Sequence, residues 1–461
     1  MANSCAAEAQ TQTPPPPPPP PVCTVSTLPL PASDATITVD VSRKFQTIDG
    51  FGTSQRLFDD PHVTNTSNPT TGRGGVVIPA DQQIAIMRAL YSDIGLTRAR
   101  YSTDPNVEPV NDNGDPSVTD LSKFNFAWKG ADGHIAQVNA DRAYGLTKWW
   151  GSPLTPGESW MAANDVPEYV EWALAIIRHW NAAGTPLTWW SLFNEPAAFS
   201  GLGTRSGEFM RDAIKRIGPV LVAEGIPTRI LIPDDLNPAE AFNRSSIILA
   251  DPAARQYVVA IGTHPYGGSP NNNSMAELSA LAKQYGLPLW MTEWSTPDWW
   301  TWANAMHTWL HDFDIGAIDY QWGFFGEWEG PGPRLISIQS LGTQYIGFVR
   351  EKHYYVMGHY SAYVRPGTPR VAADPSGASS SSLRVTAYFD GTKVVVVVLN
   401  VGHSDVATRI ELGAGIPCVR TLAAVRTSGI ESGAQQPMVT LDAPHFVTTF
   451  PAQSITTLVA Q

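Results

Sequence analysis

Short apolar runs alternate with segments of helical periodicity through the middle of the chain. Runs of strand length lie near residue 50 and at 96–102, 146–152, 187–193, 229–234, 258–266, 288–294 and 315–323. Apolar residues at helical spacing occur between several of them, at 81–90, 165–183, 207–224, 274–285 and 299–312. Hydrophobic strands separated by helices indicate a parallel sheet covered by helices. Eight such units predict an α/β fold, a (β/α)8 TIM barrel over residues 49–365.

The pattern changes after residue 365. Two β-rich runs in SLRVTAYFDGTKVVVVVLNV (382–401) meet at Asp390-Gly391, a strong hairpin signal, and the later apolar runs lack helical spacing. These features predict an antiparallel β-sandwich side domain over residues 366–461. Alternating apolar residues from Thr36 to Val41 predict N-terminal strands within 34–48 that join this domain.

The first 33 residues have a different composition. Residues 14–21 are eight consecutive prolines, which form a stiff polyproline II spacer, and we expect residues 1–33 to be disordered. The start shows no signal peptide, since it lacks a basic and an apolar region. A proline spacer behind a short start containing Cys5 is typical of the mature end of an exported protein, so we expect a secreted or cell-surface location.

Composition limits the possible partners. Hydrophobic residues make up 43% of the chain and charged residues 16%, as in a large, well-buried enzyme. A net charge of -12 argues against nucleic acid and favours a neutral or basic partner. No apolar stretch is long enough to span a membrane. The three cysteines have no metal-ligand spacing, and we expect no metal, no cofactor and a monomeric protein.

Two glutamates follow or end predicted barrel strands. Glu195 follows the strand LTWWSLF, and Glu293 ends PLWMTEW. In a (β/α)8 barrel the carboxyl ends of the strands form one mouth, so both carboxylates are predicted to face it. Two facing carboxylates are the smallest set of catalytic groups that cleaves a glycosidic bond. Neither has a basic residue beside it in the sequence, so we expect both to be unpaired against apolar surface, with perturbed pKa values.

Several motifs together resemble glycoside hydrolase family 30, over nearly the whole chain after the proline run. They are IDGFGTS (48–54), Asn194-Glu195-Pro196, Thr292-Glu293-Trp294, HYYVMGHYSAYVRPGTPRV (353–371) and FPAQSITTLVA (450–460). The resemblance implies a barrel joined to a side β-domain that is built from both chain ends. It also implies that Glu195 is the acid/base, Glu293 the nucleophile and Asn194 a ligand of the sugar 2-hydroxyl. His264 and Tyr266 would follow strand 6, with Tyr266 orienting Glu293.

Tryptophan is abundant, with 16 residues. Aromatic faces are platforms for sugar rings, although most tryptophans serve as core. Trp149, Trp150, Trp294 and Trp322 lie on or beside predicted barrel strands and are the candidates for stacking on substrate. The helical stripe that contains Trp172 and Trp180 is interpreted as core.

Together these features predict a secreted retaining β-glycoside hydrolase that cleaves a hemicellulose-type polysaccharide, with β-1,4-xylan as the first choice. The alternatives are a β-1,6-galactanase or β-1,6-glucanase, an exo-acting β-glycosidase, and a carbohydrate-binding protein with an inactive barrel. In the segment FGEWEGPGPRLI only Arg334 could bind a glucuronate carboxylate, and the residues around it differ from those in glucuronoxylan-specific relatives. This argues against cleavage that depends on glucuronate.

Overall fold

The structure is a computed structural model, and it describes most of the chain beyond residue 30. The described residues are 31–64, 68–103, 106–154, 157–162, 164–198, 205–266, 273–330, 332, 334–416, 421–441 and 445–460. The proline spacer and all three cysteines lie outside these ranges. In the part that is described, no helix has the length and apolar character needed to cross a bilayer.

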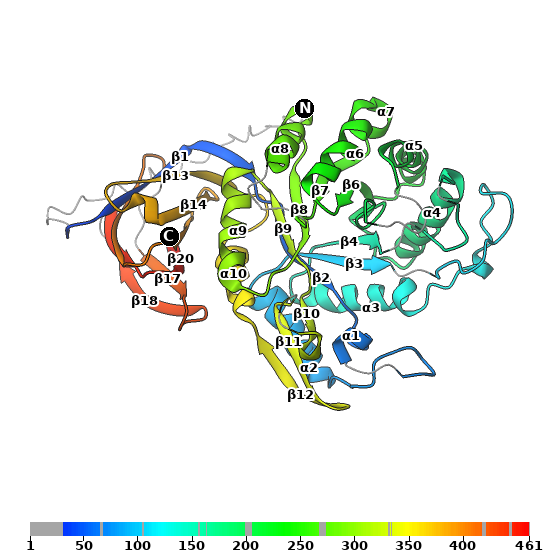
Figure 1. Cartoon of the computed structure of the whole chain (residues 1–461), viewed down its shortest axis with the longest axis horizontal. Helices are drawn as coiled ribbons and strands as arrows, with labels where there is room; N and C mark the ends of the chain where they lie inside the picture. The colour runs from blue at the N-terminus through cyan, green and yellow to red at the C-terminus, as the bar shows by residue number, and fades with distance from the viewer. Residues whose placement is uncertain are drawn as a thin grey trace, which may run out of the picture.

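Eight parallel strands close into a barrel, in which β2 pairs with both β3 and β9. The barrel strands are β2 (Gly50–Gln55), β3 (Arg98–Thr103), β4 (Lys148–Pro153), β5 (Trp189–Ser191), β6 (Arg229–Asp235), β7 (Val258–Thr263), β8 (Leu289–Trp294) and β9 (Ala317–Tyr320). They occur where the apolar runs predicted them, and the predicted (β/α)8 barrel is confirmed (Figure 1).

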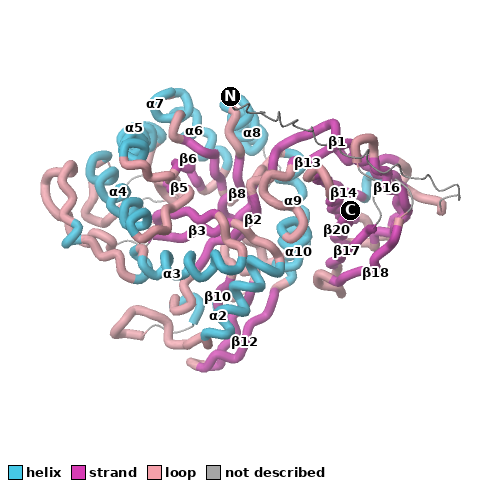
Figure 2. The backbone as a smooth tube through the Cα atoms, turned by 180° about the vertical axis from the view of Figure 1, so that it is seen from behind, coloured by secondary structure: helices cyan, strands magenta, loops and turns pink. Residues whose placement is uncertain are grey.

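Helices surround the barrel (Figure 2). They are α1 (Pro61–Thr64), α2 (Ala80–Met87), which continues into the π-helical turn η1 (Arg88–Asp93), α3 (Asp132–Asp141), α4 (Val166–Ala182), α5 (Gly207–Ala223), α6 (Pro238–Ala250), α7 (Pro252–Arg255), α8 (Asn273–Tyr285), α9 (Trp299–Asp312) and α10 (Lys352–Ser361). The sequence interpretation missed α6, although Asn237 caps it by accepting from the backbone of Glu240 at 3.0 Å and Pro238 opens it.

A small sheet extends the barrel after its last strand. It consists of β10 (Phe324–Gly326), β11 (Ile336–Leu341) and β12 (Gln344–Arg350), which the sequence analysis did not identify as strands. Most side chains of β12 are partly or fully exposed, so its hydrophobic alternation is weak.

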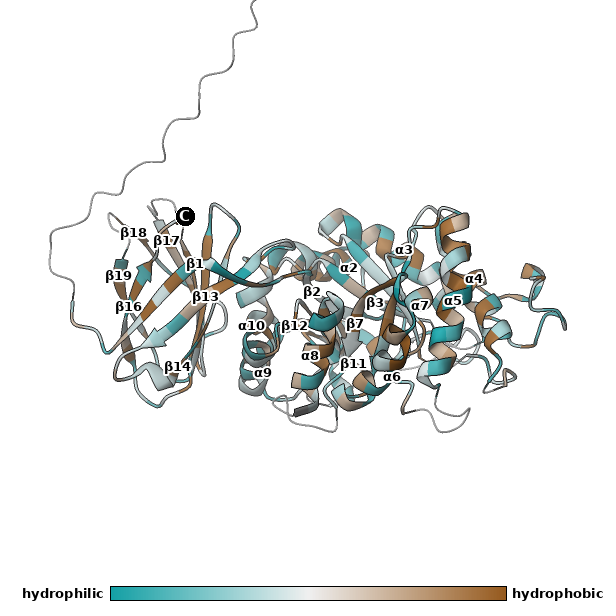
Figure 3. Ribbon diagram, turned by 90° about the horizontal axis from the view of Figure 1, so that it is seen from above, coloured by the Kyte–Doolittle hydropathy of each residue, from teal (hydrophilic) through white to brown (hydrophobic). Residues whose placement is uncertain are grey.

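Nine strands form the side domain as one continuous sheet, with a separate apolar core. They are β1 (Ala35–Thr47), β13 (Pro369–Ser376), β14 (Leu383–Phe389), β15 (Val394–Asn400), β16 (Val406–Leu412), β17 (Thr421–Thr427), β18 (Ala434–Thr440), β19 (His445–Phe450) and β20 (Ser454–Ala460). Only the pairing of β1 with β16 is parallel. The predicted antiparallel side domain is therefore confirmed, and Figure 3 shows it beside the barrel.

The amino-terminal half of the barrel interior is filled by large side chains. Trp150, Trp189 and Trp290 pack there with small or aliphatic residues of the other strands. Below the mouth, Arg98 donates two hydrogen bonds to Asp319, at 3.1 and 2.9 Å, and both side chains are fully buried. The barrel is thus closed from below by packed tryptophans and a buried ion pair, and a second group of polar side chains lies towards the carboxyl ends of its strands.

Candidate active site

The backbone at the mouth is fixed by hydrogen bonds between neighbouring strand ends. The N–H of Glu195 donates to the carbonyl of Asp234 at 2.9 Å, and the N–H of His264 donates to that of Asp235 at 2.7 Å. Glu195 and Asp234 both adopt positive φ, at 48° and 60°. This conformation is uncommon for residues other than glycine and clusters at functional sites.

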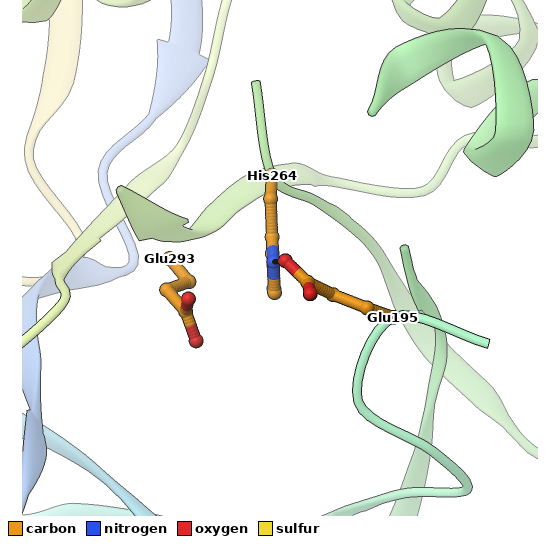
Figure 4. Close-up of side chains that lie close together, drawn as sticks. All are labelled: Glu195, His264 and Glu293. Carbon is orange, nitrogen blue, oxygen red and sulfur yellow. Dashed lines mark hydrogen bonds and ion pairs between the residues drawn. The ribbon is translucent and has the colours of Figure 1, made fainter. Parts of the chain in front are cut away.

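Three side chains converge in the centre of the mouth. A carboxylate oxygen of Glu195, a ring nitrogen of His264 and a carboxylate oxygen of Glu293 all lie within 4.8 Å of one another. Figure 4 shows His264 between the two glutamates. The sequence predicted that the two carboxylates would face one mouth, and the structure brings them together there.

Glu293 is 7% exposed and accepts hydrogen bonds on both oxygens. Oε1 accepts from the hydroxyl of Tyr266 at 3.1 Å and from Nε2 of Gln321 at 3.4 Å. Oε2 accepts from the guanidinium of Arg100. A cation and a phenol therefore stabilise the ionised form of this carboxylate.

Glu195 belongs to a chain of three titratable side chains. Its Oε1 lies 2.7 Å from Nδ1 of His264, whose Nε2 lies 3.1 Å from Oδ1 of Asp234. Burial opposes a charged imidazole, but the carboxylates of Glu293, Asp234 and Glu195 outweigh burial and raise the pKa of His264 to about 10. The imidazole therefore stays protonated near neutral pH and donates to both neighbours.

Arg100 connects the network from β3. Besides Glu293, its guanidinium donates to Asn194 Oδ1, to Ser152 Oγ at 3.2 Å and to Asp234 Oδ2 at 3.3 Å. Burial raises and Arg100 lowers the pKa of Asp234, and the net effect is a pKa well below its ordinary value. The expectation that both glutamates are unpaired is therefore wrong, because the basic partners come from strands distant in the sequence.

The sequence interpretation missed Arg100, Asp234 and Gln321. A signal existed for the first of these: Arg98 and Arg100 stand two apart in a buried strand, so both side chains point into the barrel. For Asp234 the signal was an acidic pair at the end of the strand RILIPDD.

The structure places the four candidate tryptophans in two different settings. Trp149 and Trp150 lie in the amino-terminal half of β4, are 9% and 0% exposed, and belong to the core. Their expected role in stacking on substrate is corrected accordingly. Trp322 is 7% exposed, with Phe325 stacked at 5.5 Å and the guanidinium of Arg56 3.9 Å from its ring centre, so little of its surface is left for substrate. Trp294 is partly buried and packs against Trp302 and Trp309 of α9, so its ring turns towards that helix.

The residue types of the convergent trio could also serve as metal ligands. However, both ring nitrogens of His264 and both oxygens of Glu293 already have hydrogen-bond partners. A metal would have to replace these bonds and approach Arg100. The arrangement therefore fits proton transfer and nucleophilic chemistry better than metal binding.

The fold and site define a class: a (β/α)8 barrel with a side β-domain and two carboxylates held in different environments at the mouth. No family model matches the chain. Among curated proteins, the chain is 28% identical over 240 residues to the glucuronoxylanase XynC of Bacillus subtilis, covering 51% of this chain and 54% of that protein. The chain thus spans about half the length of this curated relative.

Solved structures match over almost the whole chain. The catalytic domain of a family 30 xylanase from Talaromyces cellulolyticus has a TM-score of 0.72 and 20% identity, covering 92% of this chain and all of that one. An endo-β-1,6-glucanase has a TM-score of 0.68 and 18% identity, covering 92% and 93%. Together with the motifs, these comparisons confirm the resemblance to glycoside hydrolase family 30.

Proposed function

We propose that the protein is a retaining β-glycoside hydrolase, with Glu293 as nucleophile and Glu195 as acid/base. The observation that carries this proposal is the approach of their carboxylate oxygens to within 4.8 Å. Retaining enzymes hold their carboxyl groups about 5–5.5 Å apart, whereas inverting enzymes need about 6.5–9.5 Å for a water molecule.

In the first step, Glu293 attacks the anomeric carbon while Glu195 gives a proton to the departing glycosidic oxygen. Arg100 and Tyr266 support the nucleophile role, because both donate to Glu293 and favour its ionised form. His264 holds Oε1 of Glu195. Oε2 accepts from none of the described residues, and we assign it to carry the acid proton.

In the second step, Glu195 removes a proton from water, and the oxygen of that water displaces Glu293 from the anomeric carbon. The sugar leaves with its original anomeric configuration, and Glu195 is protonated again. Since Oδ1 of Asn194 is engaged by Arg100, its amide N–H group is left to donate to the 2-hydroxyl of the bound sugar. No step needs a cofactor.

We propose a hemicellulose as substrate, with β-1,4-xylan first. The similarity to a glucuronoxylanase and to a family 30 xylanase supports this choice. Recognition of glucuronate is disfavoured, because Arg334 is 5% exposed and its guanidinium bonds Ser337 and the carbonyl of Gly326. Unsubstituted xylan is therefore the expected polymer.

β-1,6-Glucan is the second candidate, because a β-1,6-glucanase shares the fold over almost the whole chain. We further propose that the protein acts outside the cell, as a polymeric substrate requires, and as a monomer. Light scattering of the purified full chain tests the monomer, and fractionation of the native cells tests the location.

The decisive experiment is a product profile over time on unsubstituted xylan, glucuronoxylan, β-1,6-galactan and β-1,6-glucan. A ladder of xylo-oligomers from the first polymer is the expected result, with Glu293→Ala as the inactive control. A ladder from β-1,6-glucan alone would replace the xylanase proposal by the second candidate. A single small product from the earliest time would indicate exo action. No release from any polymer or from aryl β-glycosides would overturn the proposed activity.

A further inference from the structure

Asp234 is a buried carboxylate at the mouth to which the two reaction steps assign no role. Its side chain is fully buried, and both of its oxygens have hydrogen-bond partners. Oδ1 lies 3.1 Å from Nε2 of His264, while Oδ2 accepts from Oγ of Ser152 at 2.8 Å and from the guanidinium of Arg100 at 3.3 Å. Because no part of this carboxylate is open to the mouth, Asp234 acts on the reaction only through its neighbours.

The backbone of Asp234 is also connected to the proposed acid/base. Its φ of 60° lies in the left-handed region, which costs energy for residues other than glycine, although Asp tolerates it better than most. In this conformation its carbonyl accepts from the N–H of Glu195 at 2.9 Å, while its side chain bonds the imidazole that holds the carboxylate of Glu195. Asp234 thus influences both the backbone and the side chain of Glu195.

The charge of the imidazole depends on Asp234. A ring that donates from both nitrogens must be the imidazolium, because the neutral ring has only one N–H group. Among the described residues, the ring nitrogens of His264 bond only Glu195 and Asp234, and Glu195 is neutral when it carries the acid proton. Asp234 is then the one hydrogen-bonded partner of the ring, within the described part of the chain, that is ionised. Burial would raise the pKa of Asp234, but Arg100 and His264 lower it well below its ordinary value.

Other charged and titratable groups also surround the ring of His264, but they do not bond its nitrogens. With the two partners just named, the groups are Arg100, Glu195, Asp234, Asp235, Tyr266 and Glu293. Glu293 is paired with Arg100, and Asp235 is paired with Arg244 at 2.8 Å. Tyr266 meets the imidazole edge-on, with ring centres 5.8 Å apart. Asp234 is therefore the group best placed to keep the imidazole charged.

A neutral imidazole would weaken Glu195 as an acid in either of its tautomers. With its proton on Nε2, the ring would accept the proton of Glu195 at Nδ1 and turn it away from the substrate. With its proton on Nδ1, the ring would still donate to Oε1 of Glu195 but would carry no charge. The carboxylate that forms when the glycosidic oxygen is protonated would then be less stabilised, because charge-assisted hydrogen bonds are the stronger ones.

We propose that Asp234 is a positioning residue, which keeps the imidazole of His264 charged so that Glu195 presents its acid proton on Oε2 and donates it readily. The inference rests on the proposed acid/base role of Glu195. Oε2 gives its proton to the leaving oxygen in the first step and receives one from water in the second. The protons of His264 stay in place throughout, so the imidazolium and the Asp234 carboxylate end each cycle unaltered.

The first test measures the protonation of His264 in the full chain by nitrogen NMR of isotope-labelled histidine. Both ring nitrogens resonate as N–H groups in the imidazolium, whereas a neutral ring shows one N–H and one bare nitrogen. The signal is assigned by its absence from His264→Gln. The wild type should show the imidazolium at neutral pH, and Asp234→Asn the neutral ring. A neutral His264 in the wild type, or an imidazolium in a folded Asp234→Asn variant, overturns the proposal.

The second test compares a substrate that needs the acid with one that does not. Asp234→Asn keeps the shape of the side chain and removes its charge. On unsubstituted xylan, whose leaving group needs protonation, its kcat/KM should fall at least about tenfold more than on dinitrophenyl β-xylobioside, whose leaving group departs unaided. Equal losses on the two substrates overturn the proposal, because a defect that reached the nucleophile through Arg100 would affect both alike. If β-1,6-glucan is the polymer cleaved, the corresponding pair from that glucan is used.

Ser152→Ala is the matched control for both tests. It removes a hydrogen bond to the same oxygen of Asp234 and leaves the charge in place. The control should keep the imidazolium, and any loss of kcat/KM should be equal on the two substrates. Turnover of the aryl glycoside by the wild type, and its absence in Glu293→Ala, test the proposed function separately, so the two failures can be told apart.

Discussion

Removing the hydroxyl of Tyr266 tests directly whether its hydrogen bond orients Glu293, the proposed nucleophile. Tyr266 donates to Glu293 Oε1 at 3.1 Å, and Tyr266→Phe deletes this bond while keeping the ring. Arg100 still pairs with the other oxygen, so the charge of Glu293 stays compensated. The variant should therefore fold normally and lose only the orientation and stabilisation that the phenol supplies.

The size of the expected loss in kcat/KM follows from the charge of the acceptor, the carboxylate of Glu293. A hydrogen bond to a charged group contributes about 1.5–3 kcal/mol, and each 1.36 kcal/mol changes a rate about tenfold. If the bond is lost from the transition state, kcat/KM should fall roughly 10- to 150-fold. The fall should be similar on the polymer and on an aryl β-glycoside, because the nucleophile acts on both.

The assay compares kcat/KM and Tm of the wild type, Tyr266→Phe and a control, Tyr345→Phe. The control deletes a phenol on β12 that bonds Gln82 at 3.3 Å, away from the mouth. It should keep full activity. A Tyr266→Phe enzyme with unchanged Tm and with activity within about twofold of the wild type would refute the reasoning.

Other consequences can be measured on the same protein. Glu293→Ala should abolish turnover while the protein still folds, whereas Glu195→Ala should still act on substrates with good leaving groups and respond to added azide; equal loss on all substrates would contradict the acid/base role. The pKa of His264 is about 10 against an ordinary 6.5, so its contribution to stability should be complete below pH 6.5 and decline as pH rises towards 10. Urea titrations of wild type and His264→Gln check this, because the difference between their unfolding free energies should shrink over that window. Trp150→Phe should lower Tm by several degrees through loss of core packing and leave KM unchanged, and a large rise in KM at constant Tm would restore its assignment as a substrate platform.

The sequence could predict the barrel because its strands are buried on both faces and therefore show as continuous apolar runs. The helix α6 was missed for a specific reason. Its cap residues Asn237 and Pro238 follow the strand RILIPDD at once, and no element was assigned between that strand and the next one at 258–266. The hairpin of β11 and β12 was missed because its exposed residues carry little alternation.

The site was only partly predictable because its electrostatics depend on neighbours across the barrel. Strand ends identified the positions of Glu195 and Glu293, and the family resemblance implied that of Tyr266. The residues adjacent in sequence led to the wrong prediction that the glutamates have no basic partner, since Arg100 is 193 positions from Glu293. Closure of the barrel places β3 and β8 across its interior from each other and so creates that contact, and no local pattern reports it.

The position of β1 has a consequence for how the chain folds as it is made. This strand lies between β13 and β16, and its first partner begins about 320 residues after β1 ends. At about 5–20 residues per second, β1 waits on the order of 15–65 s for that partner, with Ile37 and Val39 exposed. The side domain can therefore close only after the barrel has been synthesised, and a chain cut short before β13 carries an unpaired apolar strand prone to aggregation.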